Sequence, residues 1–419
     1  MLRSVSMPRI LMVSTEYPPM QGGVGRYTFN LTKALRKLGF EVNVVSNKLG
    51  SGEFSGLSPK TPENSNLLLE IVERTEPDLV HVQYEPGLYG LRLDPLNPRK
   101  TSTNIDLFYK YCQTPIVTTF HSAYPFKQWL SLITSIKDST KRNRLSKFSQ
   151  NAIRYWKMFL NYYSFHNLNK EKLARSKAGI VFSNYMSKMI GGGEVILHGA
   201  EPSSSVSFSK NEARKMFNLP ECGRIALALG FMTATKGWDI IEKMNIPEGW
   251  TVVVNSSKNH YNTEKFNPNF VKKNVINLRK DFLTEKELSL LFSSADAVIL
   301  PYTVSSGSGV MFDALAHGLP FIATNLEFFK EFSQKGLGIT VNRSPDEFSK
   351  ALVILDRDYV KYINTVELFR KEISWQGIAS QHAHIYSQII KQSIVAASSD
   401  LLPLQLQKSH QMRTPIAEY

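Results

Sequence analysis

The sequence predicts an α/β protein of two domains, each built around a parallel sheet. Short apolar runs rich in Val, Ile and Leu alternate with segments in which apolar residues recur at the helical period. The chain has 419 residues, and single hydrophobic cores stop growing at about 250–300 residues, so two domains are expected. Residues 202–209 are rich in serine and mark the predicted linker.

The first series opens with a strand at residues 9–14, a glycine-containing loop and a helix at residues 26–38 that Gly39 ends. The loop is not the dinucleotide-binding fingerprint, because Thr28 stands where the third glycine would be. Further strands are predicted at residues 41–46, 77–83, 115–120, 178–183 and 195–197. His121 follows one of them, and ligands of open parallel sheets bind beyond the carboxyl ends of the strands. A lone histidine there is also compatible with a purely structural role.

The second series has predicted strands at residues 225–230, 251–255, 275–278, 297–302 and 320–324. A serine- and glycine-rich loop at residues 305–309 leads into a helical segment that has no breaker before Gly318. The N-terminus of a helix presents free N–H groups and a positive dipole end, which suit an anion such as a phosphate. From the loop alone two interpretations stay open: a phosphate-binding turn, and a turn that needs glycine only for its geometry.

Residues 125–177 differ in character, because they are helical in pattern and combine aromatic with basic residues. The aromatic residues include Trp129, Phe148, Tyr155, Trp156, Phe159, Tyr162, Tyr163 and Phe165. One interpretation is a basic amphipathic surface over residues 127–157 that contacts an anionic membrane or an anionic lipid-linked acceptor. The other is a pair of ordinary helices with aromatic residues in the core and solvated lysines. No nucleic-acid partner is expected, because no RNA- or DNA-binding signature occurs.

The overall composition restricts the partners and the compartment. Lys and Arg outnumber Asp and Glu by 50 to 36, a net charge of +14, which attracts anionic partners. No apolar run approaches the roughly 18–20 residues of a membrane span, and the first residues lack the apolar core of a signal peptide. Cys112 and Cys222 are too few for a disulfide framework or a cysteine-based zinc site. We expect a cytoplasmic protein with peripheral contact at the inner face of the cell membrane.

Several segments resemble, in order, the motifs of glycosyltransferase family 4, which comprises retaining enzymes of the GT-B fold. They are Tyr-Pro-Pro-Met-Gln-Gly-Gly-Val-Gly-Arg-Tyr at 17–27, Thr-Phe-His at 119–121, Ile-Leu-His-Gly-Ala-Glu at 196–201, Gly-Phe-Met-x-x-x-Lys-Gly at 230–237, Ser-Ala-Asp-Ala-Val-Ile-Leu-Pro at 294–301, and the loop and helix at 305–320. Trp375 and the helix that follows it to Ile390 resemble the family's C-terminal helix.

The resemblance implies two Rossmann-like domains that face each other across a cleft. Residues 1–203 would form the acceptor-side domain, together with a C-terminal helix at 376–395 that crosses back onto it. Residues 204–375 would form the domain that binds the nucleotide-sugar donor. The polar tail at 397–419 is expected to be disordered.

The resemblance also implies the residues of the site. His121 would hydrogen-bond the donor sugar near the reaction centre, and Lys236 would stabilise the donor diphosphate; these are the predicted catalytic residues. The predicted donor-binding residues are Gly22, Gly23, Ser306, Gly307, Ser308, Gly309, Val310 and Asp313. Arg26 and Tyr84 are predicted to contact the acceptor. No cofactor and no metal are expected, since the sequence has no Asp-x-Asp pair and no His/Glu cluster with ligand spacing.

Two positions depart from the family pattern. Ser305 replaces the first acid of the Glu-x7-Glu signature, whose second acid corresponds to Asp313. Phe231 replaces the arginine that contacts the donor diphosphate in the family, while Lys236 remains. We interpret both changes as the character of a subfamily with serine- and glycine-rich loops.

The predicted function is therefore that of a metal-independent, retaining hexosyltransferase of polysaccharide or glycoconjugate biosynthesis. It would move a sugar from a nucleotide-diphosphate sugar to a glycan or lipid-linked acceptor. The alternative is a catalytically degenerate GT-B protein that acts as a binding or scaffold subunit, which Ser305 and Phe231 would explain.

Overall fold

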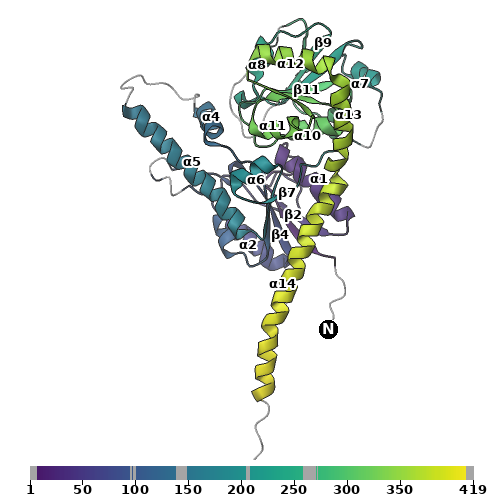
Figure 1. The fold of residues 1–419 in the computed structure, drawn as a ribbon. Coiled ribbons are helices and arrows are strands. Elements are labelled where there is room, and N and C mark those ends of the chain that lie inside the picture. Colours follow the sequence, from purple (N-terminus) through teal and green to yellow (C-terminus); the bar gives the residue numbers. More distant parts are fainter. Residues whose placement is uncertain are drawn as a thin grey trace, which may run out of the picture.

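The structure is a computed structural model that describes residues 7–94, 97, 101–137, 149–203, 208–257, 270 and 272–411. For residues 133–137, 149–155, 157 and 396–411 it describes the backbone alone. Two α/β domains are stacked one on the other, and helix α14 leaves the second domain and runs along the first (Figure 1).

The first domain is built on a sheet with the strand order β3-β2-β1-β4-β5-β6-β7, in which neighbouring strands are parallel. Its strands are β1 (Arg9–Val13), β2 (Glu41–Ser46), β3 (Phe54–Ser55), β4 (Leu79–Tyr84), β5 (Ile116–Phe120), β6 (Ala178–Val181) and β7 (Glu194–Val195). Its helices are α1 (Gly23–Lys37), α2 (Asn64–Thr75), η1 (Pro86–Tyr89), α3 (Asp106–Tyr111), α4 (Phe126–Lys137), α5 (Ser149–Arg175) and α6 (Asn184–Ile190). The central strands are buried on both faces, which explains their continuous apolar runs.

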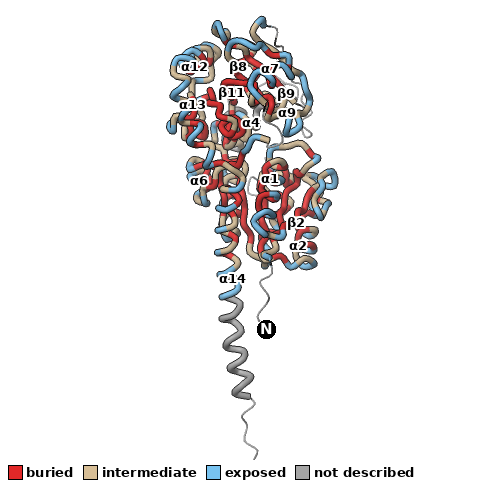
Figure 2. The backbone as a smooth tube through the Cα atoms, turned by 90° about the vertical axis from the view of Figure 1, so that its right-hand side faces the viewer, coloured by how far each residue is buried: buried red, intermediate tan, exposed pale blue. Residues whose placement is uncertain are grey.

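The second domain is built on a parallel sheet with the strand order β10-β9-β8-β11-β12-β13. Its strands are β8 (Arg224–Phe231), β9 (Trp250–Ser257), β10 (Val275–Asn277), β11 (Ala297–Leu300), β12 (Phe321–Thr324) and β13 (Gly338–Val341). Its helices are α7 (Lys210–Met216), η3 (Ala234–Lys236), α8 (Trp238–Lys243), α9 (Glu285–Ser293), α10 (Gly309–Ala316), α11 (Glu327–Ser333), α12 (Pro345–Arg357), α13 (Tyr359–Phe369) and η4 (Arg370–Ile373). Buried residues concentrate in the two sheets and the helix faces turned toward them (Figure 2). The prediction of two parallel α/β domains is confirmed.

Helix α14 (Trp375–Gln411) leaves the second domain and crosses back onto the first, as predicted. It packs beside α1, and its residues Ile378, Ala379, Tyr386 and Ile389 belong to the hydrophobic core of the first domain. The predicted end of this helix differs from the structure, because the helix continues past residue 395 to Gln411 through part of the segment expected to be disordered. Residues 412–419 lie outside the described residues.

Helices α4 and α5 form an arm that extends outward from the first domain (Figure 1). Some of its aromatic residues are buried, as expected for ordinary core helices, and others are exposed, as expected for a membrane-contacting surface. Trp129 and Phe165 are buried, and Phe126 contacts Phe159 across the two helices with ring centroids 5.6 Å apart. Trp156 and Tyr163 are exposed, at 63% and 58%. Residues 138–148 of this arm lie outside the described residues.

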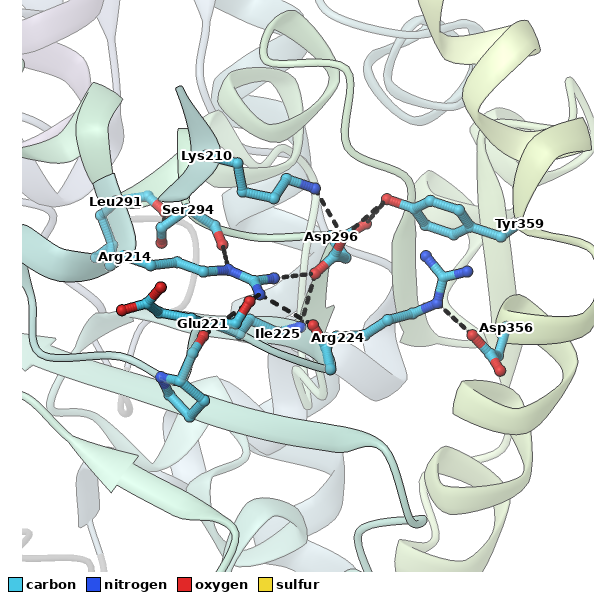
Figure 3. A network of polar contacts seen from close by, with 12 residues as sticks. Lys210, Arg214, Glu221, Arg224, Ile225, Leu291, Ser294, Asp296, Asp356 and Tyr359 are labelled. Atoms are coloured by element: carbon cyan, nitrogen blue, oxygen red, sulfur yellow. Dashed lines mark hydrogen bonds and ion pairs between the residues drawn. The ribbon is translucent and has the colours of Figure 1, made fainter. Parts of the chain in front are cut away.

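A buried polar network joins three elements of the second domain at the amino ends of β8 and β11 (Figure 3). The Asp296 carboxylate accepts hydrogen bonds from Arg214 Nη2 at 2.8 Å, from the Ile225 amide at 2.8 Å and from Lys210 Nζ at 2.7 Å. Arg214 also donates to the carbonyl oxygens of Ser294, Pro220, Glu221 and Gly223. Since ligands bind at the opposite, carboxyl edge of such a sheet, this network is structural.

Candidate functional site

The carboxyl ends of the strands in the two domains meet at the predicted serine–glycine loop. A Cβ atom placed on Gly307, in the loop after β11, would lie 3.9 Å from the carbonyl oxygen of His121 and 3.7 Å from the ring of Phe182. His121 follows β5 and Phe182 follows β6, both in the first domain. The structure therefore brings the predicted catalytic histidine and the predicted donor loop together.

The loop itself is fixed by hydrogen bonds within and between the domains. The Ser305 amide donates to Oε1 of Gln128 on α4 at 3.0 Å, and the Ser305 hydroxyl donates to the Gly307 carbonyl at 3.1 Å. Ser308 caps α10, since its hydroxyl accepts the Met311 amide at 3.2 Å. Ser305 thus turns its side chain into the loop.

The remaining predicted donor residues lie around the N-terminus of α10. Ser306 is 2% exposed and lies near Tyr124 of the first domain. Gly309 and Val310 form the first turn of the helix and are partly exposed. A Cβ atom on Gly309 would lie 3.6 Å from Nε2 of His198. The amino end of α10 therefore points at the first domain.

Lys236 lies beside the same loop. Its ammonium group is 3.9 Å from the centroid of the Tyr302 ring, directly after β11, and its methylene groups pack on Gly230. The segment is held there because Thr303 donates its amide to the Thr235 carbonyl at 2.9 Å. Gly237 has φ +74°, and a Cβ atom on it would lie 1.8 Å from the Pro301 carbonyl oxygen, so glycine is required.

Arg26 of α1 reaches across to the second domain. Its Nη1 is 2.5 Å from Oδ2 of Asp313 on α10, and its Nε and Nη2 contact the Glu285 carboxylate at 2.6 Å and 2.9 Å. The Asp313 side chain is only 5% exposed, while that of Glu285 is 59% exposed. The two residues predicted to contact acceptor and donor therefore contact each other in this structure.

Glu16 occupies the space beside the glycines of the first loop. A Cβ atom on Gly22 would lie 2.0 Å from Oε2 of Glu16, and the Gly25 amide donates to the same oxygen at 3.4 Å. Gly23, by contrast, has no atom within 4 Å of its Cβ position. Burial, together with the nearby Glu85 carboxylate, raises the pKa of Glu16 to about 7, although the backbone hydrogen bonds oppose this shift. The Glu16 carboxylate thus lies at the N-terminus of α1. Of Gly22, Gly23 and Gly25, only Gly23 has free space at its Cβ position.

His121 sits in an aromatic cluster under the loop. Its ring contacts those of Tyr27 and Phe182, with centroids 5.3 Å and 5.2 Å away. Burial is the main cause, and the neighbouring His198 a second one, that together lower the pKa of His121 to about 3. The imidazole is therefore neutral at physiological pH, and its Nε2 lies 2.9 Å from Oε1 of Gln83.

Tyr84 does not reach the site. It is the last residue of β4, it is 0% exposed, and its ring stacks on Tyr89 within the core of the first domain. The alternation of side chains along the strand turns Tyr84 toward the core. The prediction that Tyr84 contacts an acceptor is not supported by this position.

Five further residues contact the predicted site residues, but no role was predicted for them from the sequence: Glu16, Gln83, Gln128, His198 and Glu285. Glu16, Gln83 and His198 follow or end apolar strand runs, as His121 does, so the same rule could have selected them. Gln128 and Glu285 lie on helices and reach the site only through domain contact, which local pattern does not reveal. Among the described residues no group of three or more His, Cys, Asp or Glu side chains is arranged to hold a metal ion.

Two family models match the sequence of this chain. The sequence model described as Glycosyltransferase Family 4 matches residues 21–190, and the one described as Glycosyl transferases group 1 matches residues 246–358. The chain belongs to glycosyltransferase family 4. It is therefore a glycosyltransferase of the GT-B type, and the matched ranges contain both the Arg26–His121 region and the donor loop. No curated protein matches the sequence closely enough to add to this assignment.

Solved structures share the fold of this glycosyltransferase at low identity. Sucrose-phosphate synthase from Thermosynechococcus elongatus has a TM-score of 0.63 at 15% identity, with 92% of this chain and 100% of that chain covered. Anabaena HepE in complex with UDP-glucose has a TM-score of 0.60 at 12% identity, covering 92% and 99%. The catalytic domain of starch synthase IV from Arabidopsis thaliana, bound to ADP and acarbose, has a TM-score of 0.55 at 14% identity, covering 92% and 100%.

Proposed function

We propose that this glycosyltransferase moves a hexosyl group from a nucleotide-diphosphate sugar to a glycan or lipid-linked acceptor, with retention of the anomeric configuration. The observation that carries the proposal is the contact between the Gly307 loop of the second domain and His121 of the first. The donor would lie where these two elements meet. Fold neighbours solved with UDP-glucose and with ADP are consistent with a donor of this class.

The chemistry follows from the leaving group. Departure of a nucleoside diphosphate requires stabilisation of the charge that grows on its phosphates. Lys236, the backbone amides of Ser306 to Val310 and the positive end of the α10 dipole would perform this task, and the position of Lys236 beside this loop supports the proposal. No carboxylate of this loop is available as a nucleophile, because Ser305 stands at the position of the first family acid. Retention would then result from front-face attack assisted by the leaving phosphate.

Asp313 and Arg26 would exchange partners when the donor binds. In the family pattern, Asp313 corresponds to the acid that holds the nucleotide ribose. In the structure, Nη1 of Arg26 donates a hydrogen bond to Oδ2 of Asp313. A ribose hydroxyl that takes this place would release Arg26 toward the diphosphate or an anionic acceptor, which keeps Arg26 in its predicted role.

The first test is donor profiling followed by transfer. Thermal shift with UDP-, GDP- and ADP-sugars should select one donor, since binding to the native state raises its stability. Transfer of a radiolabelled sugar from that donor to a membrane lipid extract should follow, and it should persist in EDTA if the enzyme is metal-independent. His121→Ala should remove transfer. A protein that binds no nucleotide and neither transfers nor hydrolyses any donor would instead fit the degenerate binding subunit.

The arm formed by α4 and α5 supports a peripheral membrane role, with the protein at the cytoplasmic face. Trp156 and Tyr163 lie seven residues apart on α5, so they share one helix face, and both are exposed. Exposed aromatic residues in a basic segment suit the interface of an anionic bilayer. No helix within the described ranges is long and apolar enough to cross a membrane.

Vesicle sedimentation tests the membrane role. The protein should co-sediment with anionic vesicles more than with zwitterionic ones, and Trp156→Ala with Tyr163→Ala should reduce this. If the double variant binds anionic vesicles as well as the unmodified protein does, the arm is not the membrane-contacting surface. Val360→Ala with Leu368→Ala is a matched control, because these exposed apolar residues (71% and 72%) lie on the other domain.

A further inference from the structure

A line of buried hydrogen bonds connects His121 to helix α14. His121 Nε2 lies 2.9 Å from Gln83 Oε1, and Gln83 Nε2 lies 3.2 Å from His81 Nε2. His81 Nδ1 in turn lies 2.5 Å from the hydroxyl of Tyr386 on α14. Gln83, His81 and Tyr386 are all 0% exposed. The orientation of each group therefore depends on its neighbours and not on water.

The surroundings of Gln83 fix which way its amide points. Its Nε2 lies 3.2 Å from the thioether sulfur of Met12. A thioether accepts hydrogen bonds and cannot donate, so the amide NH₂ group must face Met12. The second N–H of that group then donates to His81 Nε2. The opposite orientation would place the Oε1 lone pairs against the sulfur, and it is disfavoured.

The position of the amide determines the proton on His121. With Oε1 of Gln83 facing it, Nε2 of His121 must be the protonated nitrogen. Because the ring is neutral, Nδ1 keeps a lone pair. His81 Nε2 also lies 2.8 Å from the Thr119 hydroxyl, which can donate to it. His81 then has the other tautomer, since its Nε2 accepts from Gln83 and Thr119 and its Nδ1–H donates to Tyr386.

We propose that Gln83 is a positioning residue that holds His121 as the Nε2–H tautomer, so that His121 meets the donor sugar as a hydrogen-bond acceptor through Nδ1. This inference rests on the proposed function for the role of His121, but the tautomer itself does not. A hydroxyl group of the sugar donates to Nδ1, and Gln83 prevents the ring from presenting an N–H in its place. Second-layer partners of functional histidines commonly act in this way.

Other histidines of the two domains provide an internal reference. Nδ1 faces a backbone carbonyl oxygen in His198 (Gly199, 2.8 Å), His317 (Asp313, 2.7 Å) and His382 (Ile378, 2.9 Å). Each of these must be an Nδ1–H tautomer, because a carbonyl oxygen only accepts. His121 should thus differ from His81, His198, His317 and His382.

Long-range ¹H–¹⁵N correlation spectra of the full-length protein labelled at histidine test the assignment without any variant. The expected result is a protonated Nε2 and a bare Nδ1 for His121, and the reverse for the other four. A protonated Nδ1 on His121, or averaged signals, would overturn the proposal. Complete absence of transfer activity with the expected spectrum would reject the proposed function and leave the tautomer assignment standing.

Variants test the consequence for transfer. Gln83→Met removes the acceptor at similar size, and kcat/KM should fall about 10–100-fold while the His121 signals become averaged. Gln83→Glu keeps an acceptor oxygen toward His121 and should preserve the Nε2–H signal, although its second oxygen faces Met12 and His81, so this variant is judged by the His121 spectrum and not by its activity. Tyr386→Phe is the matched control, because it changes the partner of His81 and leaves the Gln83–His121 contact in place. A Gln83→Met protein with an unchanged spectrum and unchanged kcat/KM would refute the proposal; if that variant does not fold, loss of the Nε2–H signal in Gln83→Glu would refute it.

Discussion

Arg26 of the first domain forms an ion pair with Asp313 of the second, with 2.5 Å between Nη1 and Oδ2. The two residues are 287 positions apart in the chain. The pair joins the first turn of α1 to the middle of α10, so it ties together the two loops that the resemblance assigns to the donor. Glu285 adds an exposed second partner to the same guanidinium group.

Removal of Arg26 should weaken the closed arrangement of the domains. Arg26→Ala leaves the Asp313 carboxylate buried without its partner, and loss of one partner of a buried pair costs about 3–5 kcal/mol. We expect a lower free energy of unfolding in urea and a loss of transfer. The matched control is Glu285→Ala, which removes the exposed partner and should cost about 0–1 kcal/mol. Equal effects of the two variants would show that the Asp313 contact is not the important one.

The Glu16 carboxyl should make stability depend on pH in a defined window. Its pKa is about 7 in the folded protein against an ordinary 4.5, so between these values the unfolded chain releases a proton that the folded chain keeps. The free energy of unfolding should therefore fall as pH rises through this window, by about 3 kcal/mol in total. Glu16→Gln cannot titrate and should flatten the profile measured by urea unfolding from pH 4 to 8. A Glu16→Gln profile that still falls as steeply would assign the dependence to another group.

The two neighbouring glycines of the first loop should respond differently to alanine. Gly22→Ala brings a Cβ atom into the Glu16 carboxylate and should destabilise the protein by about 1–3 kcal/mol. Gly23→Ala meets no atom within 4 Å and places a better helix former at the start of α1, so stability should be kept or slightly raised. If the open face of Gly23 receives the donor, Gly23→Ala should nevertheless bind nucleotide sugar less tightly in calorimetry. Unchanged affinity would remove Gly23 from the donor site.

The Asp296 network should stabilise the second domain without affecting chemistry. Asp296→Ala leaves the buried Arg214 guanidinium without its carboxylate and should cost about 3–5 kcal/mol. Lys210→Ala removes the half-exposed partner of the same carboxylate and should cost about 0–1 kcal/mol. Thermal and urea unfolding measure both effects. At a temperature where Asp296→Ala is still folded, its kcat should equal that of the wild type; a reduced kcat would connect the network to the site.

The strands that carry the site could be predicted from the sequence because they are buried on both faces. Residues 116–120 and 297–300, for example, form strands where the apolar runs predict them. The edge strands β3 and β13 were missed, since they are short and only partly buried. The equally short edge strands β7 and β10 were located, so local pattern identifies edge strands less consistently than central ones.

Within the site, sequence located the elements but not the contacts between domains. The Ser306–Val310 turn and His121 were placed correctly at strand and helix ends, because those positions follow from local order along the chain. The Arg26–Asp313 pair depends on how two domains dock, which no local pattern contains. Tyr84, predicted to contact the acceptor, is buried, since a strand end alone does not say which face its last side chain occupies.

Helix α14 has a consequence for how the protein is made. The core of the first domain contains Ile378, Ala379, Tyr386 and Ile389, which are synthesised after the whole of the second domain. The second domain, in contrast, is contiguous from α7 to η4, and its buried core residues other than Ala200 lie within that range. The first domain is thus completed only after the second has been synthesised, and a nascent chain stalled before residue 375 would carry a first domain with an uncovered core.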